Sequence, residues 1–144
     1  MDYQDFASRF SRHADLLDVR AFAEVVEGSD RYPLLVGQSV GRKSLLITAG
    51  FHGDEIAGPL TLLNHLPEIL AYATARDVGL RIYPCLNPSG FTDGTRYNRQ
   101  GESPNNDFLR YEIAPGEWVG ELAYGQRFSR YRLCLLYTSD AADE

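Results

Sequence analysis

The sequence predicts an α/β fold in which helices cover both faces of a β-sheet. The chain has 144 residues, of which 44% are hydrophobic and 24% are charged, and these values are typical of one soluble globular domain. Two strongly apolar segments, residues 44–49 and 80–86, have the composition of buried strands, and a helical segment separates them. Because α/β sheets are built from this strand–helix–strand order, the order favours that class.

The N-terminal third is predicted to form helix first and then strands. Apolar residues within 3–27 recur at a spacing that predicts one or two amphipathic helices. Residues 28–30 predict a turn, and residues 32–39 predict a strand. A second turn at 41–43 leads into the apolar strand 44–49.

The middle of the chain is predicted to be helical. A helix is expected over residues 54–66, because Asp54 and Glu55 carry the negative charge that is favoured at a helix N-terminus. Pro67 is expected to end this helix or to open another one over residues 67–76.

A strand and a long loop are predicted to follow. Residues 80–86 predict the third strand, and residues 87–107 are rich in Asn, Gly, Pro and Ser, which predicts a loop. A loop of this length inside a compact domain is more often functional than not.

Composition argues against several classes of protein. The net charge of −6 lacks the basic footprint that non-specific nucleic-acid binding needs. Cys85 and Cys134 do not make a disulfide framework. The N-terminus lacks the apolar core of a signal peptide, and no apolar run reaches membrane-spanning length. We therefore expect a cytoplasmic protein without nucleic-acid or membrane partners, of open oligomeric state.

His52 and Glu55 form the first pattern that carries chemistry. An apolar strand runs into a glycine-rich turn, and these two residues follow, three positions apart, at the predicted helix start. Residues at this spacing can point the same way, and imidazole nitrogen and carboxylate oxygen are ligands that zinc accepts. The alternative is a histidine at a strand end beside an ordinary acidic helix start, since His-x-x-Glu alone is common.

Three further motifs follow the 80–86 strand in a fixed order. With His52 and Glu55 they resemble the zinc carboxypeptidase family and its relatives, the murein-peptide amidases and the succinylglutamate desuccinylase and aspartoacylase group. The matching residues are Asn87, Pro88, Gly90, Thr95, Arg96, Asn98, Gly101, Asn105 and Phe108. The resemblance covers about residues 44–108.

The resemblance implies both a fold and a reaction. The fold is a mixed, twisted sheet flanked by helices, as in zinc carboxypeptidases. The reaction is zinc-dependent hydrolysis of an amide bond in a peptide or an N-acyl amino acid, by a metal-activated water. His52 and Glu55 would hold Zn²⁺ with a later histidine, and Arg96 would stabilise the developing oxyanion. If the register is shifted by three residues, Arg99 takes that role.

The substrate-binding residues depart from the family pattern. The resemblance implies that Asn105 orients the substrate. Asn106 stands where the family has an arginine that binds a substrate carboxylate, and an asparagine cannot offer the bidentate fork. Arg99, Arg110 or a later residue could take that function.

Two parts of the implied site have no match in this chain, namely the third zinc ligand and a later catalytic glutamate. His13 and His65 are expected to be ordinary helix histidines, and Glu117 and Glu121 solvated carboxylates. One alternative is therefore a truncated, catalytically inactive fragment with an incomplete metal site. Another is a non-enzymatic α/β binding domain.

The last eleven residues, 134–144, resemble the translation of a transposase-type sequencing adapter. The alternative is a natural amphipathic tail. On the adapter interpretation, residues 1–133 are the N-terminal part of one zinc-peptidase-like catalytic domain, truncated before its later strands, and residues 134–144 are a non-native tail.

Overall fold

The computed structural model describes residues 1–102, 111–114 and 117–119. The elements are α1 (Tyr3–Ser11), η1 (Arg12–Asp15), β1 (Asp18–Glu27), β2 (Asp30–Gln38), β3 (Lys43–Thr48), α2 (Ala57–Thr74), β4 (Val78–Tyr83), α3 (Pro88–Asp93), β5 (Tyr111–Ala114) and β6 (Glu117–Val119). β5 and β6 pair with each other in a two-stranded sheet.

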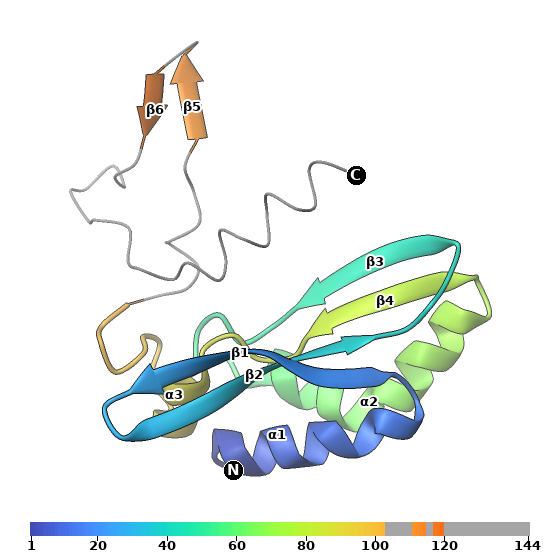
Figure 1. The fold of residues 1–144 in the computed structure, drawn as a ribbon, viewed down its shortest axis with the longest axis horizontal. Coiled ribbons are helices and arrows are strands. Elements are labelled where there is room, and N and C mark those ends of the chain that lie inside the picture. Colours follow the sequence, from blue (N-terminus) through green and yellow to red (C-terminus); the bar gives the residue numbers. More distant parts are fainter. Residues whose placement is uncertain (103–110, 115–116, 120–144) are drawn as a thin grey trace.

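The main sheet is mixed and has the strand order β1-β2-β4-β3 (Figure 1). β1 pairs antiparallel with β2, and β2 pairs antiparallel with β4. β3 pairs in parallel with β4, which α2 connects to it along the chain. The predicted class, an α/β protein with a mixed sheet flanked by helices, is confirmed.

α1 and α2 pack against the same face of this sheet (Figure 1). Phe6 and Phe10 of α1 meet Leu66 of α2 and Ile82 of β4 in one core, and all four side chains are fully buried. Burial of one such side chain contributes about 1.5–3 kcal/mol. The sequence predicted helices on both faces, whereas the two long helices of the described residues share one face. Among these residues, no helix is both long and apolar enough to cross a membrane.

The prediction of helix over residues 3–27 holds only for its first half. α1 begins at a cap, where the Asp2 side chain accepts a hydrogen bond from the Asp5 backbone N–H at 2.8 Å. From Asp18 onward the chain is instead strand β1, which forms a hairpin with β2. Gly28 permits the tight turn with its positive φ of 63°. The hairpin decides the conformation, because it pairs the backbone groups of β1 along the whole strand.

α2 differs from the prediction at its start. It begins at Ala57, so Asp54 and Glu55 lie in the turn before it. The predicted interruption at Pro67 is confirmed, because α2 consists of two helical segments joined by a kink, at which His65 has the non-helical angles φ −119° and ψ 15°. Pro67 has no N–H for the Leu63 carbonyl four residues earlier. The Nε2 atom of His13 lies 3.2 Å from that carbonyl oxygen and donates to it instead.

The segment 87–107, predicted as loop, contains the short helix α3. The Asn87 side chain caps α3 by accepting a hydrogen bond from the Gly90 backbone N–H at 3.0 Å. Pro88 supplies the fixed φ that suits a first helical position. Gly94 ends the helix in the left-handed conformation. β4 ends at Tyr83, three residues before its predicted end.

Candidate metal centre

The candidate site lies where the parallel strands β3 and β4 end. The segments that follow the two strands remain hydrogen-bonded to each other. The Ala49 N–H donates to the Tyr83 carbonyl at 3.0 Å, and the Asn87 N–H donates to the Gly50 carbonyl at 2.8 Å. Open α/β sheets generally place their ligands at such carboxyl ends. The two segments that carry the first two motifs are therefore held side by side.

Two glycines allow these segments to approach closely. Gly50 has a φ of 66°, and a Cβ atom there would lie 2.8 Å from the Cys85 Sγ atom. A Cβ atom on Gly53 would lie 1.9 Å from the Gly90 carbonyl carbon. No side chain fits at that distance, so the turn after β3 packs directly on the backbone of α3 only because position 53 is glycine.

His52 and Glu55 converge in this turn. The Nδ1 atom of His52 lies 2.8 Å from the Oε1 atom of Glu55. The His52 side chain is 9% exposed and the Glu55 side chain is 65% exposed, so the pair joins a buried imidazole to an accessible carboxylate. The spacing predicted convergence at a helix start. The structure shows the convergence in the turn before α2, where the Glu55 N–H donates to the His52 carbonyl at 3.3 Å.

Arg96 lies beside this pair. Its Nη1 atom is 3.8 Å from the Oε1 atom of Glu55, and its side chain is half exposed. Its backbone carbonyl accepts hydrogen bonds from the Gly53 N–H at 3.4 Å and from the Asn87 Nδ2 atom at 3.2 Å. A permanently charged guanidinium is therefore held next to the two candidate metal ligands.

Asn87 has a structural function that the motif alone did not reveal. Its side chain is completely buried, and its Nδ2 atom donates to the carbonyls of Phe51 and Arg96 at 3.3 and 3.2 Å. Since its Oδ1 atom also caps α3, one amide connects the turn after β3, α3 and the loop of Arg96. The sequence signal for this function was the Asn-Pro pair directly after a strand.

Arg99, the other predicted site residue that the structure describes, does not join His52 and Glu55. The guanidinium of Arg99, predicted to bind substrate, is paired with the carboxylates of Asp93 and Asp30. Asn105 and Asn106 lie outside the described residues. In the part of the chain that the structure describes, no three His, Cys, Asp or Glu side chains gather closely enough to hold a metal ion.

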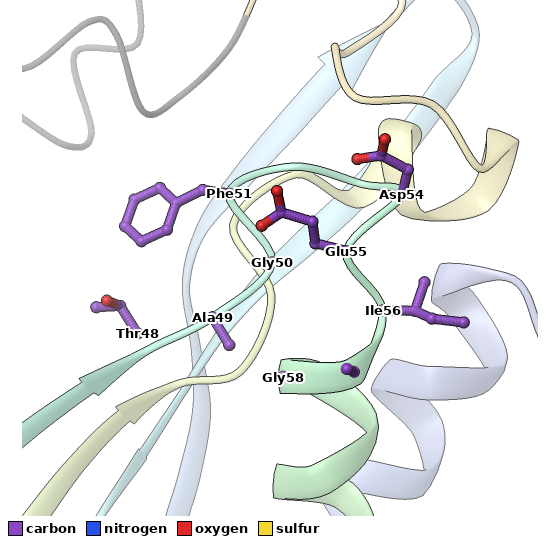
Figure 2. Close-up of a pocket in the computed structure, with 9 residues that line it drawn as sticks. Thr48, Ala49, Gly50, Phe51, Asp54, Glu55, Ile56 and Gly58 are labelled. Atoms are coloured by element: carbon purple, nitrogen blue, oxygen red, sulfur yellow. The ribbon is translucent and has the colours of Figure 1, made fainter.

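A cavity of about 590 Å³ opens beside Glu55. Its lining residues are Thr48, Ala49, Gly50, Phe51, Asp54, Glu55, Ile56, Ala57 and Gly58. In Figure 2 the Glu55 carboxylate points into the space enclosed by the turn between β3 and α2, whereas the Phe51 ring points away from it. The carboxylate of the candidate metal pair is thus accessible to a small molecule.

Comparison with known families agrees with this arrangement. Residues 41–112, half of the chain, match the succinylglutamate desuccinylase/aspartoacylase catalytic domain. The chain belongs to this family. The matched residues include His52, Glu55, Asn87 and Arg96, so the resemblance that the ordered motifs predicted is confirmed.

Solved structures with the same fold come from metallopeptidases. A proposed metallopeptidase from Shewanella amazonensis is 32% identical, with a TM-score of 0.67 over 98% of this chain and 51% of its own. One from Shewanella denitrificans is 27% identical, with a TM-score of 0.68 over 98% and 47%. A metallo-carboxypeptidase from Burkholderia cenocepacia, 20% identical with a TM-score of 0.59 over 99% and 38%, shares the fold.

The chain spans about half the length of the two Shewanella proteins. None of the curated proteins compared with it matches. The match to the family and the likeness to these structures establish the family and the fold of this chain.

Proposed function

We propose that the intact protein containing this chain is a zinc-dependent hydrolase that cuts an amide bond in a peptide or an N-acyl amino acid. One observation carries the proposal: at the carboxyl end of β3, His52 and Glu55 converge to 2.8 Å with the Arg96 guanidinium beside them. The metallopeptidase relatives support the reaction class.

The donor set fits zinc. A neutral imidazole nitrogen and a carboxylate oxygen are two of its usual protein ligands, and catalytic zinc sites commonly use three. His52 and Glu55 would hold the ion together with a histidine that this 144-residue chain does not contain, since its other two histidines, His13 and His65, belong to η1 and α2. When bound, Zn²⁺ supplies Lewis acidity toward the scissile carbonyl and a lowered pKa for water.

His52, Glu55 and Arg96 would each have a separate function in this site. His52 is nearly buried, so its ring is held in one orientation with little freedom to lose on binding. Glu55 lines the cavity, and its Oε1 atom lies 2.8 Å from the Nδ1 atom of His52. Arg96 would donate hydrogen bonds to the carbonyl oxygen of the substrate as the negative charge on that oxygen grows, which is the function of an oxyanion stabiliser.

Substitution of Arg96 tests this assignment. In the intact protein, Arg96→Ala should lower kcat/KM by about 10²–10³-fold, because a charged donor is lost where the oxyanion forms. Zinc content should stay at one ion per chain, since Arg96 is not a ligand. His52→Ala should lose the metal and the activity together. Steady-state kinetics on peptides with a free carboxyl terminus and on N-acyl amino acids, with metal analysis, measure both effects.

Arg31 provides the matched control. It is an exposed arginine whose partner, Glu24, is also exposed on the β1–β2 hairpin, so Arg31→Ala should leave kinetics and zinc content unchanged. Wild-type kinetics in Arg96→Ala would contradict the oxyanion function. Full zinc content in an inactive His52→Ala variant would contradict the ligand assignment.

A further inference from the structure

Arg99 joins two elements that are far apart in the sequence. Its Nε and Nη2 atoms donate to the two carboxylate oxygens of Asp93, at 2.7 and 3.0 Å, in a bidentate pair. Its Nη1 atom donates to the Oδ2 atom of Asp30, which also accepts a hydrogen bond from the Tyr32 hydroxyl at 3.3 Å. Asp93 ends α3, and Asp30 begins β2 at the tip of the hairpin.

This pairing differs from an ordinary surface salt bridge. The Arg99, Asp93 and Asp30 side chains are 38%, 34% and 46% exposed, and isolated pairs at such exposures contribute little. Here one guanidinium is shared by two carboxylates, and one of the pairs has the bidentate geometry that makes such contacts specific. Hydrogen bonds from Arg99 lower the pKa of both carboxyl groups.

The loop that contains Arg99 also carries Arg96. The turn after Arg96 is held together by Asn98, whose Oδ1 atom accepts hydrogen bonds from the backbone N–H groups of Gln100 and Glu102 at 3.0 and 2.8 Å. The start of this loop is bonded through its backbone: the Thr95 N–H donates to the Gly90 carbonyl at 2.9 Å, and the Arg96 carbonyl accepts from the Gly53 N–H at 3.4 Å and from the Asn87 Nδ2 atom at 3.2 Å. The guanidinium of Arg99 adds an attachment beyond Arg96, to Asp93 and Asp30.

We propose that Arg99 is a positioning residue, which fastens the loop of Arg96 to α3 and to the β1–β2 hairpin and so sets the approach of the Arg96 guanidinium to His52 and Glu55. The catalytic consequence rests on the proposed hydrolase function, whereas the attachment of the loop does not. The guanidinium is already paired on both sides by protein carboxylates, which argues against its use as a clamp for a substrate carboxylate.

Asp30→Asn is the decisive variant. Asp30 belongs to the hairpin tip, and its contact with the loop of Arg96 is the hydrogen bond from Arg99, so matching effects of Asp30→Asn and Arg99→Gln indicate that this pair is responsible. In the intact protein, Arg99→Gln should lower kcat by about 10–100-fold with KM unchanged, as is typical for residues that orient site groups. Asp30→Asn should lower kcat in the same way but less, since Asp93 still holds Arg99. The double variant should be no worse than Arg99→Gln alone.

Amide hydrogen exchange tests the attachment without any assay of activity. The N–H groups of Asn98 and Gly101 are bonded within the turn, to the carbonyls of Glu102 and Asn98. Both should exchange faster in Arg99→Gln and in Asp30→Asn than in the wild type. Arg31→Gln, which breaks the Arg31–Glu24 pair on the same hairpin, should change neither exchange nor kinetics.

The outcomes separate the two proposals. If Arg99→Gln raises KM at constant kcat and Asp30→Asn has no effect, Arg99 binds substrate and the positioning function is wrong. Unchanged exchange at Asn98 and Gly101 in both variants also overturns it, whatever the activity. If the wild type hydrolyses no amide substrate while exchange rises as expected, the hydrolase proposal fails and the attachment by Arg99 stands.

Discussion

At the scale of single residues, the site depends on Asn87. This buried amide makes hydrogen bonds to Phe51, Gly90 and Arg96, which belong to three different segments. Both of its Nδ2 hydrogen bonds go to backbone carbonyls, which can only accept. The position therefore requires a side chain that donates on one side and accepts on the other, and among residues of this size asparagine alone does both.

Asn87→Asp should destabilise the fold. The substitution replaces a donor with a carboxylate oxygen that faces two carbonyl oxygens, so the free energy of unfolding should fall by about 1–3 kcal/mol or more. Urea denaturation measures the change. Asn64→Asp is the matched control, because Asn64 is exposed on α2 and the same substitution there should have little effect. Equal destabilisation by the two variants would contradict the structural function of Asn87.

At the scale of whole elements, α2 depends on a contact outside itself. Pro67 leaves the Leu63 carbonyl without its helical donor, and His13 in the 3₁₀ helix after α1 supplies the missing hydrogen bond at 3.2 Å. The contact also attaches α2 to the segment between α1 and β1. The kink at His65 is therefore a consequence of Pro67, and a distant residue bonds to the carbonyl that the kink leaves without a helical donor.

A double-mutant cycle tests this explanation. His13→Ala should cost about 1–3 kcal/mol in the free energy of unfolding, because the Leu63 carbonyl loses its donor. In a Pro67→Ala background the new N–H can donate to the same carbonyl, so His13→Ala should cost clearly less there. Denaturation of the four proteins gives the coupling energy. The same cost in both backgrounds would show that the hydrogen bond to Leu63 is not what His13 contributes.

At the scale of the whole molecule, the site lies along one edge of the mixed sheet. The parallel pair β3 and β4 brings the turn of His52 next to α3, and the β1–β2 hairpin reaches the loop of Arg96 through Arg99. The chain spans about half the length of the two Shewanella proteins, and its described residues bring together two candidate zinc ligands. Because catalytic zinc sites commonly use three protein ligands, the proposed hydrolysis needs one ligand more than these two.

Zinc affinity should depend on the number of ligands that the protein offers. The isolated 144-residue chain should bind zinc much more weakly than the intact protein, because it offers two ligands where catalytic sites commonly use three. Equilibrium dialysis with metal analysis compares the two. Glu55→Gln should weaken binding in both, whereas Glu68→Gln, an exposed position on α2, should leave it unchanged. Equal affinity of the chain and the intact protein would contradict the need for a further ligand.

Much of the molecule followed from the sequence alone. The strands β2, β3 and β4 and the order of the motifs depend on local composition and spacing, and the family match contains those same motifs. The convergence of His52 and Glu55 was also predictable, since residues three apart in a tight turn or a first helical turn lie on one side. Local rules suffice where neighbouring residues determine the geometry.

Other features were decided only by contacts between distant residues. Residues 18–27 have apolar spacing that suits a helix or a strand, and pairing with β2 made them a strand. Pro67 predicted the interruption of the helix, but spacing alone could not show that His13, fifty residues before Leu63, donates the hydrogen bond that the Leu63 carbonyl lacks. Arg99 carries the same charge as Arg96, yet the carboxylates of Asp30 and Asp93 determine where its guanidinium lies. Strand pairing, hydrogen bonds to free carbonyls and ion pairs all join residues that are far apart in the sequence. Sequence spacing does not show which residues these are, so only the tertiary structure decides these features.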